Sequence, residues 1–230
     1  MIALDYPSAA AAETLLRQLE GFPCYMKVGM QLFYTAGPAF VERLKRLGYR
    51  VFLDLKMHDI PNTVKGGAAS IARLGVDMFN VHDAGGLRMM EAAVEGAASA
   101  SSQQTCPTVI AVTQLTSTTE FMMNHELGIP GPIEESVLHY ANIAGEAGMH
   151  GVVASPLEVK RIKAQQGDAF VTVTPGIRPA WTSSGDQART MTPGEAVSEG
   201  TDYLVIGRAI TTAKDPVHAM GKIIKEMSEA

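Results

Sequence analysis

The sequence predicts an α/β protein with a single-domain (β/α)8 TIM-barrel fold over residues 1–230. Three observations support this. Short apolar runs recur at regular intervals, segments with helical spacing lie between them, and no linker divides the chain. Fully apolar strands that alternate with helices are typical of a parallel sheet covered by helices. Eight such units in 230 residues favour a closed barrel over a doubly wound open sheet, which remains the structural alternative.

The predicted strands are short runs rich in apolar and β-branched residues, and the predicted helices lie between them. In chain order the strands are expected at residues 2–4, 25–28, 51–55, 78–81, 108–112, 152–154, 170–173 and 203–206. Helical spacing is found at residues 10–19, 39–47, 64–74, 87–98, 133–147 and 216–227. Gly48, Gly75, Gly148 and Gly200 each come shortly before a strand, as expected for left-handed caps at the ends of helices.

Composition limits the partners of the protein. With 46% hydrophobic residues the chain can form a large core, and its net charge of -5 argues against nucleic acid or an anionic membrane as a partner. No apolar run approaches the roughly 18 residues of a membrane span, and the start of the chain does not resemble a secretion signal. Cys24 and Cys106 are expected to be reduced, packed thiols, so we expect a cytoplasmic protein.

A cluster of charged residues follows the third predicted strand. Residues 54–59 read Asp-Leu-Lys-Met-His-Asp and come directly after the apolar residues 51–53. Alternation along a strand puts Asp54 and Lys56 on one face, with Asp59 just beyond the strand. Crowded charges at a partly desolvated place are unfavourable unless paired, and they are enriched at catalytic centres. A solvated strand end or a structural network of ion pairs is the alternative.

Other strand ends also carry polar residues, which is where barrel enzymes place their catalytic groups. Two lysines among several carboxylates would keep one another charged. His82 could equally be a core histidine, and Lys27 could simply reach the rim. The candidates at the strand ends are Asp5, Lys27, Asp54, Lys56, His82, Thr116, Pro175, Arg178, Gly207 and Arg208.

The last two strand ends predict a phosphate site. Gly207 lets the backbone approach closely, and the guanidinium of Arg208 can pair with two phosphate oxygens, with Arg178 as a second candidate. Residues 177–193 are polar and long for a connection, so we expect a lid on which Arg178 or Gln187 closes over a ligand. An ordinary surface loop is the alternative.

Motifs for other chemistries are missing from the sequence. There is no Cys/His cluster, no His-Glu-x-x-His pattern, no Gly-x-Ser-x-Gly elbow and no glycine-rich dinucleotide loop. These absences argue against a metal site and against a dedicated nicotinamide or nucleoside-triphosphate fold.

Along nearly its whole length the chain resembles the orotidine 5'-phosphate decarboxylase family, in its bacterial form. The Asp-x-Lys-x-x-Asp core at 54–59 is shared with the wider suprafamily, whereas Pro-Gly-Ile-Arg together with Asp-Gln is more specific. The motifs that carry the resemblance are Ala3-Leu4-Asp5, Lys27-Val28-Gly29, residues 54–63, Val81-His82, residues 113–117, residues 174–178, Gly185-Asp186-Gln187 and Gly207-Arg208.

The resemblance implies a carboxy-lyase that converts orotidine 5'-monophosphate to UMP without a cofactor, in de novo pyrimidine synthesis. It assigns the catalytic roles to Lys27, Asp54, Lys56 and Asp59, with Lys56 protonating C6 after carbon dioxide leaves. It also implies a homodimer in which Asp59 and Thr63 reach the partner's site. The implied substrate-binding residues are Asp5, Lys27, Asp54, Thr63, Thr116, Pro175, Arg178, Gln187, Gly207 and Arg208.

Asp83 departs from the family pattern, which usually has small residues after Val-His. We expect Asp83 near the dimer-facing rim, and we expect Asp83→Ala to change turnover only modestly.

Three alternative functions remain open. A sugar-phosphate decarboxylase or aldolase could use the same strand motif with Mg2+. A regulatory barrel could simply bind an anion. A Schiff-base lyase would need a lysine with a lowered pKa, which the flanking carboxylates oppose.

Overall fold

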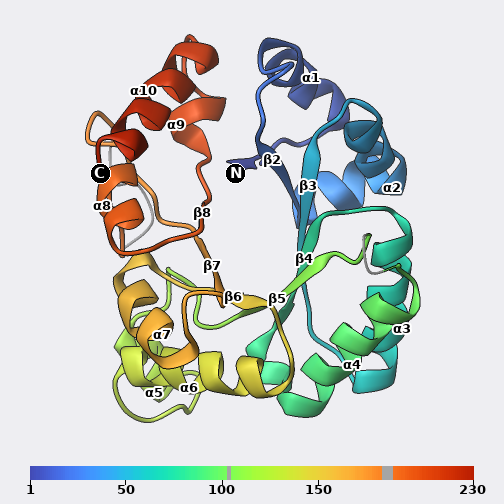
Figure 1. Cartoon of the computed structure of the whole chain (residues 1–230), viewed down its shortest axis with the longest axis vertical. Helices are drawn as coiled ribbons and strands as arrows, with labels where there is room; N and C mark the ends of the chain where they lie inside the picture. Colours follow the sequence, from blue (N-terminus) through green and yellow to red (C-terminus); the bar gives the residue numbers. More distant parts are fainter. Residues whose placement is uncertain (103–104, 183–188) are drawn as a thin grey trace.

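A computed structural model describes residues 1–102, 105–182 and 189–230. In these residues, eight parallel strands pair in sequence order, and helices surround them (Figure 1). A parallel bridge between Ile2 and Ile206 joins the first strand to the segment after the last, so the predicted (β/α)8 barrel is confirmed. The strands are β1 (Ile2–Ala3), β2 (Tyr25–Gly29), β3 (Arg50–Met57), β4 (Met78–His82), β5 (Thr108–Val112), β6 (Gly151–Val153), β7 (Val171–Thr174) and β8 (Tyr203–Leu204).

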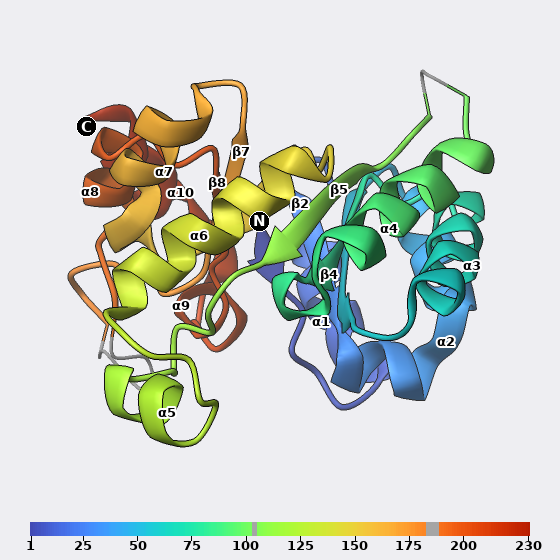
Figure 2. The same ribbon diagram turned by 90° about the horizontal axis from the view of Figure 1, so that it is seen from below.

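The helices cover the outside of the barrel, except α5, which stands beyond the C-terminal end of β5 (Figure 2). All six predicted helices are present. Sequence periodicity missed α5, α7, α8 and α9, which have only four to eight residues each. The α-helices are α1 (Ala9–Gln18), α2 (Met30–Arg46), α3 (Pro61–Arg73), α4 (Leu87–Ser99), α5 (Glu120–His125), α6 (Ile133–Glu146), α7 (Val159–Gln166), α8 (Pro193–Ser198), α9 (Arg208–Thr211) and α10 (Pro216–Ser228), and the 3-10 helices are η1 (Asp83–Gly85) and η2 (Pro156–Glu158).

Helix α2 is longer than predicted because it consists of two pieces. It begins at Met30 rather than at residue 39, and it contains a kink at Gly37, where φ is 66° and ψ is -174°. Pro38 follows, and proline lacks the N–H that a continuous helix would use. The periodic pattern therefore predicted only the second piece.

The core has two parts. A large cluster lies between the strands and the surrounding helices, and a smaller cluster fills the inside of the barrel. The interior cluster is made of Ala3, Phe52, Met78, Ile110, Val173 and Val205. Several of its members also line a cavity at the C-terminal end of the strands, so the packed interior forms the floor of that cavity.

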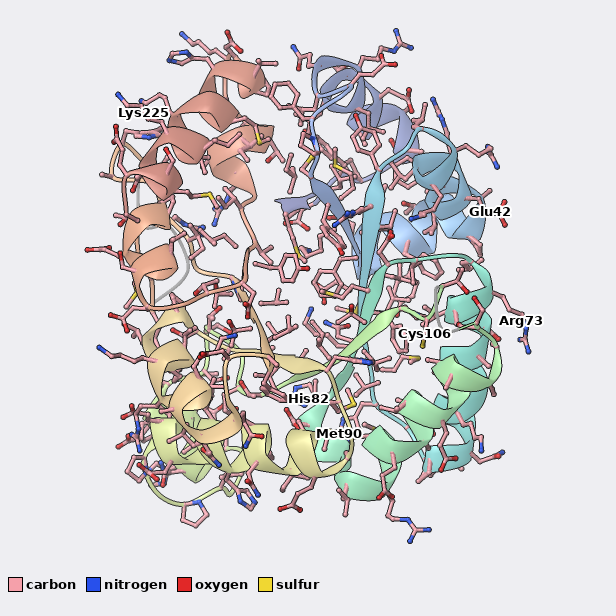
Figure 3. All side chains as sticks on the ribbon, viewed as in Figure 1. Glu42, Arg73, His82, Met90, Cys106 and Lys225 are labelled. Atoms are coloured by element: carbon pink, nitrogen blue, oxygen red, sulfur yellow. The ribbon has the colours of Figure 1, made fainter. Side chains whose placement is uncertain are left out.

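The remaining sequence predictions about the fold are mostly correct. Gly48, Gly75, Gly148 and Gly200 all have positive φ values, as predicted for helix caps. Cys24 and Cys106 are free, but the packing prediction is wrong for Cys106, which is exposed on the connection before β5 (Figure 3). Within the described residues, none of the helices is both long enough and apolar enough to span a membrane.

Candidate active site

A bulge in β3 positions the charged residues predicted from the sequence. The pairing between β3 and β4 shifts register between Leu53 and Met57. In this stretch Lys56 has a φ of 52°, the only positive value among the described residues other than glycine. Its backbone N–H donates to the Asn80 side chain, with the nitrogen 2.8 Å from Oδ1. A β-bulge redirects side chains, so the local distortion aims Lys56 into the barrel mouth.

Asp54 lies at the centre of a charged array. Its Oδ1 is 2.6 Å from Lys56 Nζ, and its Oδ2 is 3.2 Å from Lys27 Nζ. Lys27 Nζ also lies 3.4 Å from Asp5 Oδ1. Asn80 Nδ2 donates to Asp54 Oδ1 at 2.8 Å. Since Lys27 and Asp54 are both buried, the array is a desolvated chain of alternating charges.

The opposite charges in this array keep Lys27 and Asp54 ionised. Burial alone would lower the pKa of Lys27, but Asp54 and Asp5 outweigh it and leave that pKa above its ordinary value. Burial alone would raise the pKa of Asp54, but Lys27, Lys56 and the Asn80 hydrogen bond leave it lowered. Near neutral pH, Lys27 is therefore an ammonium and Asp54 a carboxylate, as expected from their neighbours.

The charged array lies in a cavity of about 670 Å³ at the C-terminal ends of the strands. The volume suits a small-molecule ligand. Nine of the predicted site residues line it, contributed by the ends of β1, β2, β3, β5, β7 and β8. They are Asp5, Lys27, Asp54, Lys56, Thr116, Pro175, Arg178, Gly207 and Arg208.

The two arginines lie where β7 and β8 end. The backbone N–H of Arg178 donates to Met191 O at 2.8 Å, and Met191 N–H donates to Gly176 O at 3.3 Å, so the two ends of the 177–193 segment are paired. Arg208 begins α9 directly after Gly207. A Cβ at position 207 would lie 3.6 Å from Ala3 Cβ and 3.8 Å from Asp5 Oδ2, in ordinary contact. Arg178, Gly207 and Arg208 all line the cavity, and arginine side chains can pair with the oxygens of an anion.

Two predicted residues do not line this cavity. Asp59 and Thr63 are exposed and are not among the lining residues, and Asp59 Oδ1 accepts a hydrogen bond from Ile60 N–H at 2.7 Å. Gln187 lies outside the described residues, as do positions 183–188 of the predicted lid.

β4 ends at His82 beside the site, and Asp83 begins η1. The ring of His82 stacks on that of His58, with centroids 5.7 Å apart, and burial, His58 and Lys56 together lower its pKa. Figure 3 shows His82 toward the middle of the molecule. Asp83 is only 1% exposed, so its predicted place at a rim is wrong. The chain turns into η1 there, and the side chain is enclosed with α4 and α6 around it.

Sequence reasoning missed Asn80, Tyr6 and Gln114. Asn80 binds both Asp54 and the Lys56 backbone, and a polar residue within the apolar run 78–81 was the signal that could have identified it. Tyr6 lines the cavity and its hydroxyl donates to Thr211 O at 3.2 Å. Gln114 also lines the cavity, next to the predicted Thr116.

Among the residues that the structure describes, no group of three or more His, Cys, Asp or Glu side chains is arranged to hold a metal ion. The carboxylate Asp54 in the cavity is paired with two lysines, Lys27 and Lys56.

The fold and the site define a (β/α)8 barrel with a charged array and two arginines around one cavity at the C-terminal ends of its strands. The model of one such family, described as Orotidine 5'-phosphate decarboxylase / HUMPS family, matches residues 1–223. The chain belongs to this family.

Named relatives are similar over almost their whole length. The chain is 52% identical over 227 residues to an orotidine 5'-phosphate decarboxylase from Geobacillus thermodenitrificans, with 98% of the chain and 95% of the relative covered. It is 50% identical over 230 residues to one from Bacillus cereus, with 100% and 96% covered. A crystal structure of the enzyme of that name from Lactobacillus acidophilus aligns with a TM-score of 0.88 and 41% identity, covering 98% and 97% of the chains.

Proposed function

We propose that this protein decarboxylates orotidine 5'-monophosphate to UMP, as a cytoplasmic enzyme of pyrimidine synthesis that needs no cofactor. The observation that carries the proposal is the Lys27–Asp54–Lys56 array in a cavity that Arg178 and Arg208 also line. The names of relatives about 50% identical over the full chain support this substrate.

The chemistry requires both charge stabilisation and a proton. Loss of carbon dioxide from C6 of the pyrimidine leaves a carbanion that the ring stabilises poorly, so preorganised positive charge must face C6. Lys56 is suited to both tasks because its ammonium group projects into the cavity while Asp54 pairs with it at 2.6 Å. The ammonium stabilises the carbanion and then donates a proton to C6. The electron pair of the broken bond between C6 and the carboxylate stays on C6 and forms the new C–H bond. The Lys56 amine then regains its proton from solvent.

The other residues bind the remaining parts of the substrate. Asp5 and Lys27 hold the ribose hydroxyls, and Thr116 contacts the pyrimidine edge. Pro175, Arg178, Gly207 and Arg208 enclose the phosphate. Binding energy from the phosphate, which lies far from C6, can hold the substrate against the charged array. Closure of a lid over 177–193, with Gln187 linking base and phosphate, stays a prediction.

The proposed assembly is a homodimer in which Asp59 and Thr63 complete the partner's site. Their exposure on the surface, outside the chain's own cavity, supports this role, as does exposed Ile60 beside them, which is 66% accessible. Asp59 would then extend the charged array across the interface.

The test is loss of orotidine 5'-monophosphate, followed by ultraviolet absorbance in the presence of EDTA. Wild type should turn over the substrate, and Lys56→Ala should lose at least about a hundredfold in kcat. Lys225→Ala is the control, since this lysine lies on the outer helix α10 and pairs with Glu229 just after it (Figure 3). Absence of turnover by folded wild type would refute the proposal. Turnover of a sugar phosphate in the presence of added Mg2+, without turnover of orotidine 5'-monophosphate, would favour sugar-phosphate chemistry instead.

A further inference from the structure

A second buried ion pair lies near the cavity but outside the charged array. Arg189 Nη1 bonds to Glu158 Oε1, and the two side chains are 13% and 4% exposed. Arg189 Nη2 also donates to the backbone carbonyl of Leu115 at 3.1 Å. Neither Arg189 nor Glu158 is among the described residues that line the cavity, whereas Leu115 is. The pair therefore touches the lining of the cavity through Leu115.

Arg189 connects three loops that follow consecutive strands. Leu115 belongs to the loop after β5, which contributes Thr116 and Ser117 to the cavity. Glu158 ends η2, in the loop after β6. Arg189 itself lies two residues before Met191, whose backbone pairs with Gly176 and Arg178 in the loop after β7. One guanidinium thus ties the wall of the cavity at Thr116 to the wall at Arg178.

Stabilisation of the fold does not by itself account for the ion pair between Arg189 and Glu158. Burial raises the pKa of Glu158, and the charge of Arg189 only opposes that rise. Among the described residues, Glu158 Oε2 and Arg189 Nε have no hydrogen-bond partner. A buried ion pair with unsatisfied atoms is commonly no more stabilising than two apolar side chains of similar volume. Its position between loops is the property that apolar residues would not reproduce.

We propose that Arg189 is a positioning residue, which holds the base-side loop after β5 and the phosphate-side loop after β7 at a defined separation. The inference rests on the proposed function. If the two walls are held together, phosphate binding also fixes the pyrimidine against Lys56. Without Arg189, the phosphate end can bind while the base end moves.

The experiment compares Arg189→Met with the double variant Arg189→Met/Glu158→Leu. The single variant leaves Glu158 buried without its partner and can fail to fold, whereas the double variant removes both charges and restores stability. For the double variant we expect a wild-type melting temperature, yet kcat/KM for orotidine 5'-monophosphate lower by about tenfold to a hundredfold. Orotidine, which lacks the phosphate, should be affected by less than about threefold, because no phosphate binding energy is lost.

Hydrogen exchange gives a readout that does not require turnover. Leu115 O also accepts from Thr118 N–H at 2.9 Å, so loss of the Arg189 contact should speed amide exchange at Thr116 and Thr118 in the ligand-free double variant. Arg161→Met is the matched control, since Arg161 makes exposed ion pairs with Glu134 and Glu135. Its kinetics and exchange should equal those of wild type.

The outcomes separate the two proposals. Wild type without turnover refutes the proposed function, and exchange at Thr116 and Thr118 still decides whether Arg189 positions the loop. A stable double variant with wild-type exchange and wild-type kcat/KM overturns the positioning role. An equal loss of kcat/KM for orotidine and its 5'-monophosphate also overturns it, because the effect would then not depend on the phosphate.

Discussion

Lys56 combines the proposed proton donor with the only left-handed backbone conformation outside glycine in the described residues. Such a conformation costs of the order of 1 kcal/mol or more in a non-glycine residue, so the surroundings must maintain it. Asn80 does this with one side chain, accepting from the Lys56 backbone and donating to Asp54. Backbone geometry and side-chain charge are therefore controlled from the same neighbouring strand.

Asn80→Ala should lower kcat by about tenfold or more with a smaller change in KM, because misplacing Lys56 affects the chemical step more than phosphate binding. Steady-state kinetics with orotidine 5'-monophosphate check this. Asn142→Ala is the control, since that amide donates to Glu146 along α6, away from the cavity. An unchanged kcat in Asn80→Ala would show that the Lys56 conformation does not depend on the amide.

Asp83 makes stability depend on pH. Burial raises its pKa from 3.8 to about 8, and its carboxyl oxygens have no hydrogen-bond partner among the described residues. The unfolded chain releases this proton at lower pH than the folded chain does. Stability is therefore lost as pH rises from about 4 to about 8, by up to about 1.4 kcal/mol per pH unit, and the loss is complete above pH 8.

Asp83→Asn removes this titration while keeping the side-chain shape. Its gain in unfolding free energy over wild type should be larger near pH 8 than near pH 5, as measured by chemical denaturation. Asp168→Asn controls for the loss of a negative charge at an exposed position. A gain that does not vary with pH would contradict the burial argument. The modest effect of Asp83→Ala on turnover stays a prediction.

At the scale of elements, sequence predicted the strands better than the helices. β5 was predicted with its exact bounds because its five residues are all apolar or β-branched. β3 extends past its prediction to Met57, since the bulge keeps charged residues within the strand. Short helices such as α9 have too few turns to show a period, and the first piece of α2 was hidden by the break at Gly37.

A side chain at position 37, in the break of α2, should destabilise the protein. Gly37 has a φ and ψ region that is essentially restricted to glycine, so Gly37→Ala should reduce the unfolding free energy by about 1–3 kcal/mol. Gly221→Ala provides the opposite case, because Gly221 lies inside α10 with no atom within 4 Å of an added Cβ. It should increase stability by about 0.4–1 kcal/mol. Denaturant titrations measure both changes in unfolding free energy. Two changes of the same sign would contradict the conformational argument.

At the scale of the molecule, the site could be predicted because parallel strands bring their C-terminal ends to one rim. This rule gathered Asp5, Lys27, Asp54 and Arg208 from distant parts of the chain. The rule about strand ends does not predict which side chains lie beneath the rim. The burial of Asp83 and the link from Arg189 to Leu115 depend on how loops fold over one another, which strand patterns do not contain.

The proposed dimer makes a prediction about mixed subunits. Lys56→Ala and Asp59→Ala should each be nearly inactive alone. When the two variants are mixed and their subunits exchange, half of the dimers should contain one subunit of each variant. Each of these dimers holds one intact site, so roughly a quarter of wild-type activity should return. Sedimentation of each variant verifies that it is dimeric. Mixtures that stay inactive despite exchange would argue that both residues serve the same chain's site.

The bridge between Ile2 and Ile206 has a consequence for how the barrel opens. It forms a seam, where the first and last parts of the described sheet meet, and the Met1 amino group reinforces it by donating to Leu204 O at 2.7 Å. Asp5 lies on one side of the seam, and Gly207 and Arg208 lie on the other. A nucleotide that contacts both sides binds the closed form alone, and so it lowers the population of opened barrels by mass action. Substrate supply would thereby protect the protein from proteases that attack opened chains.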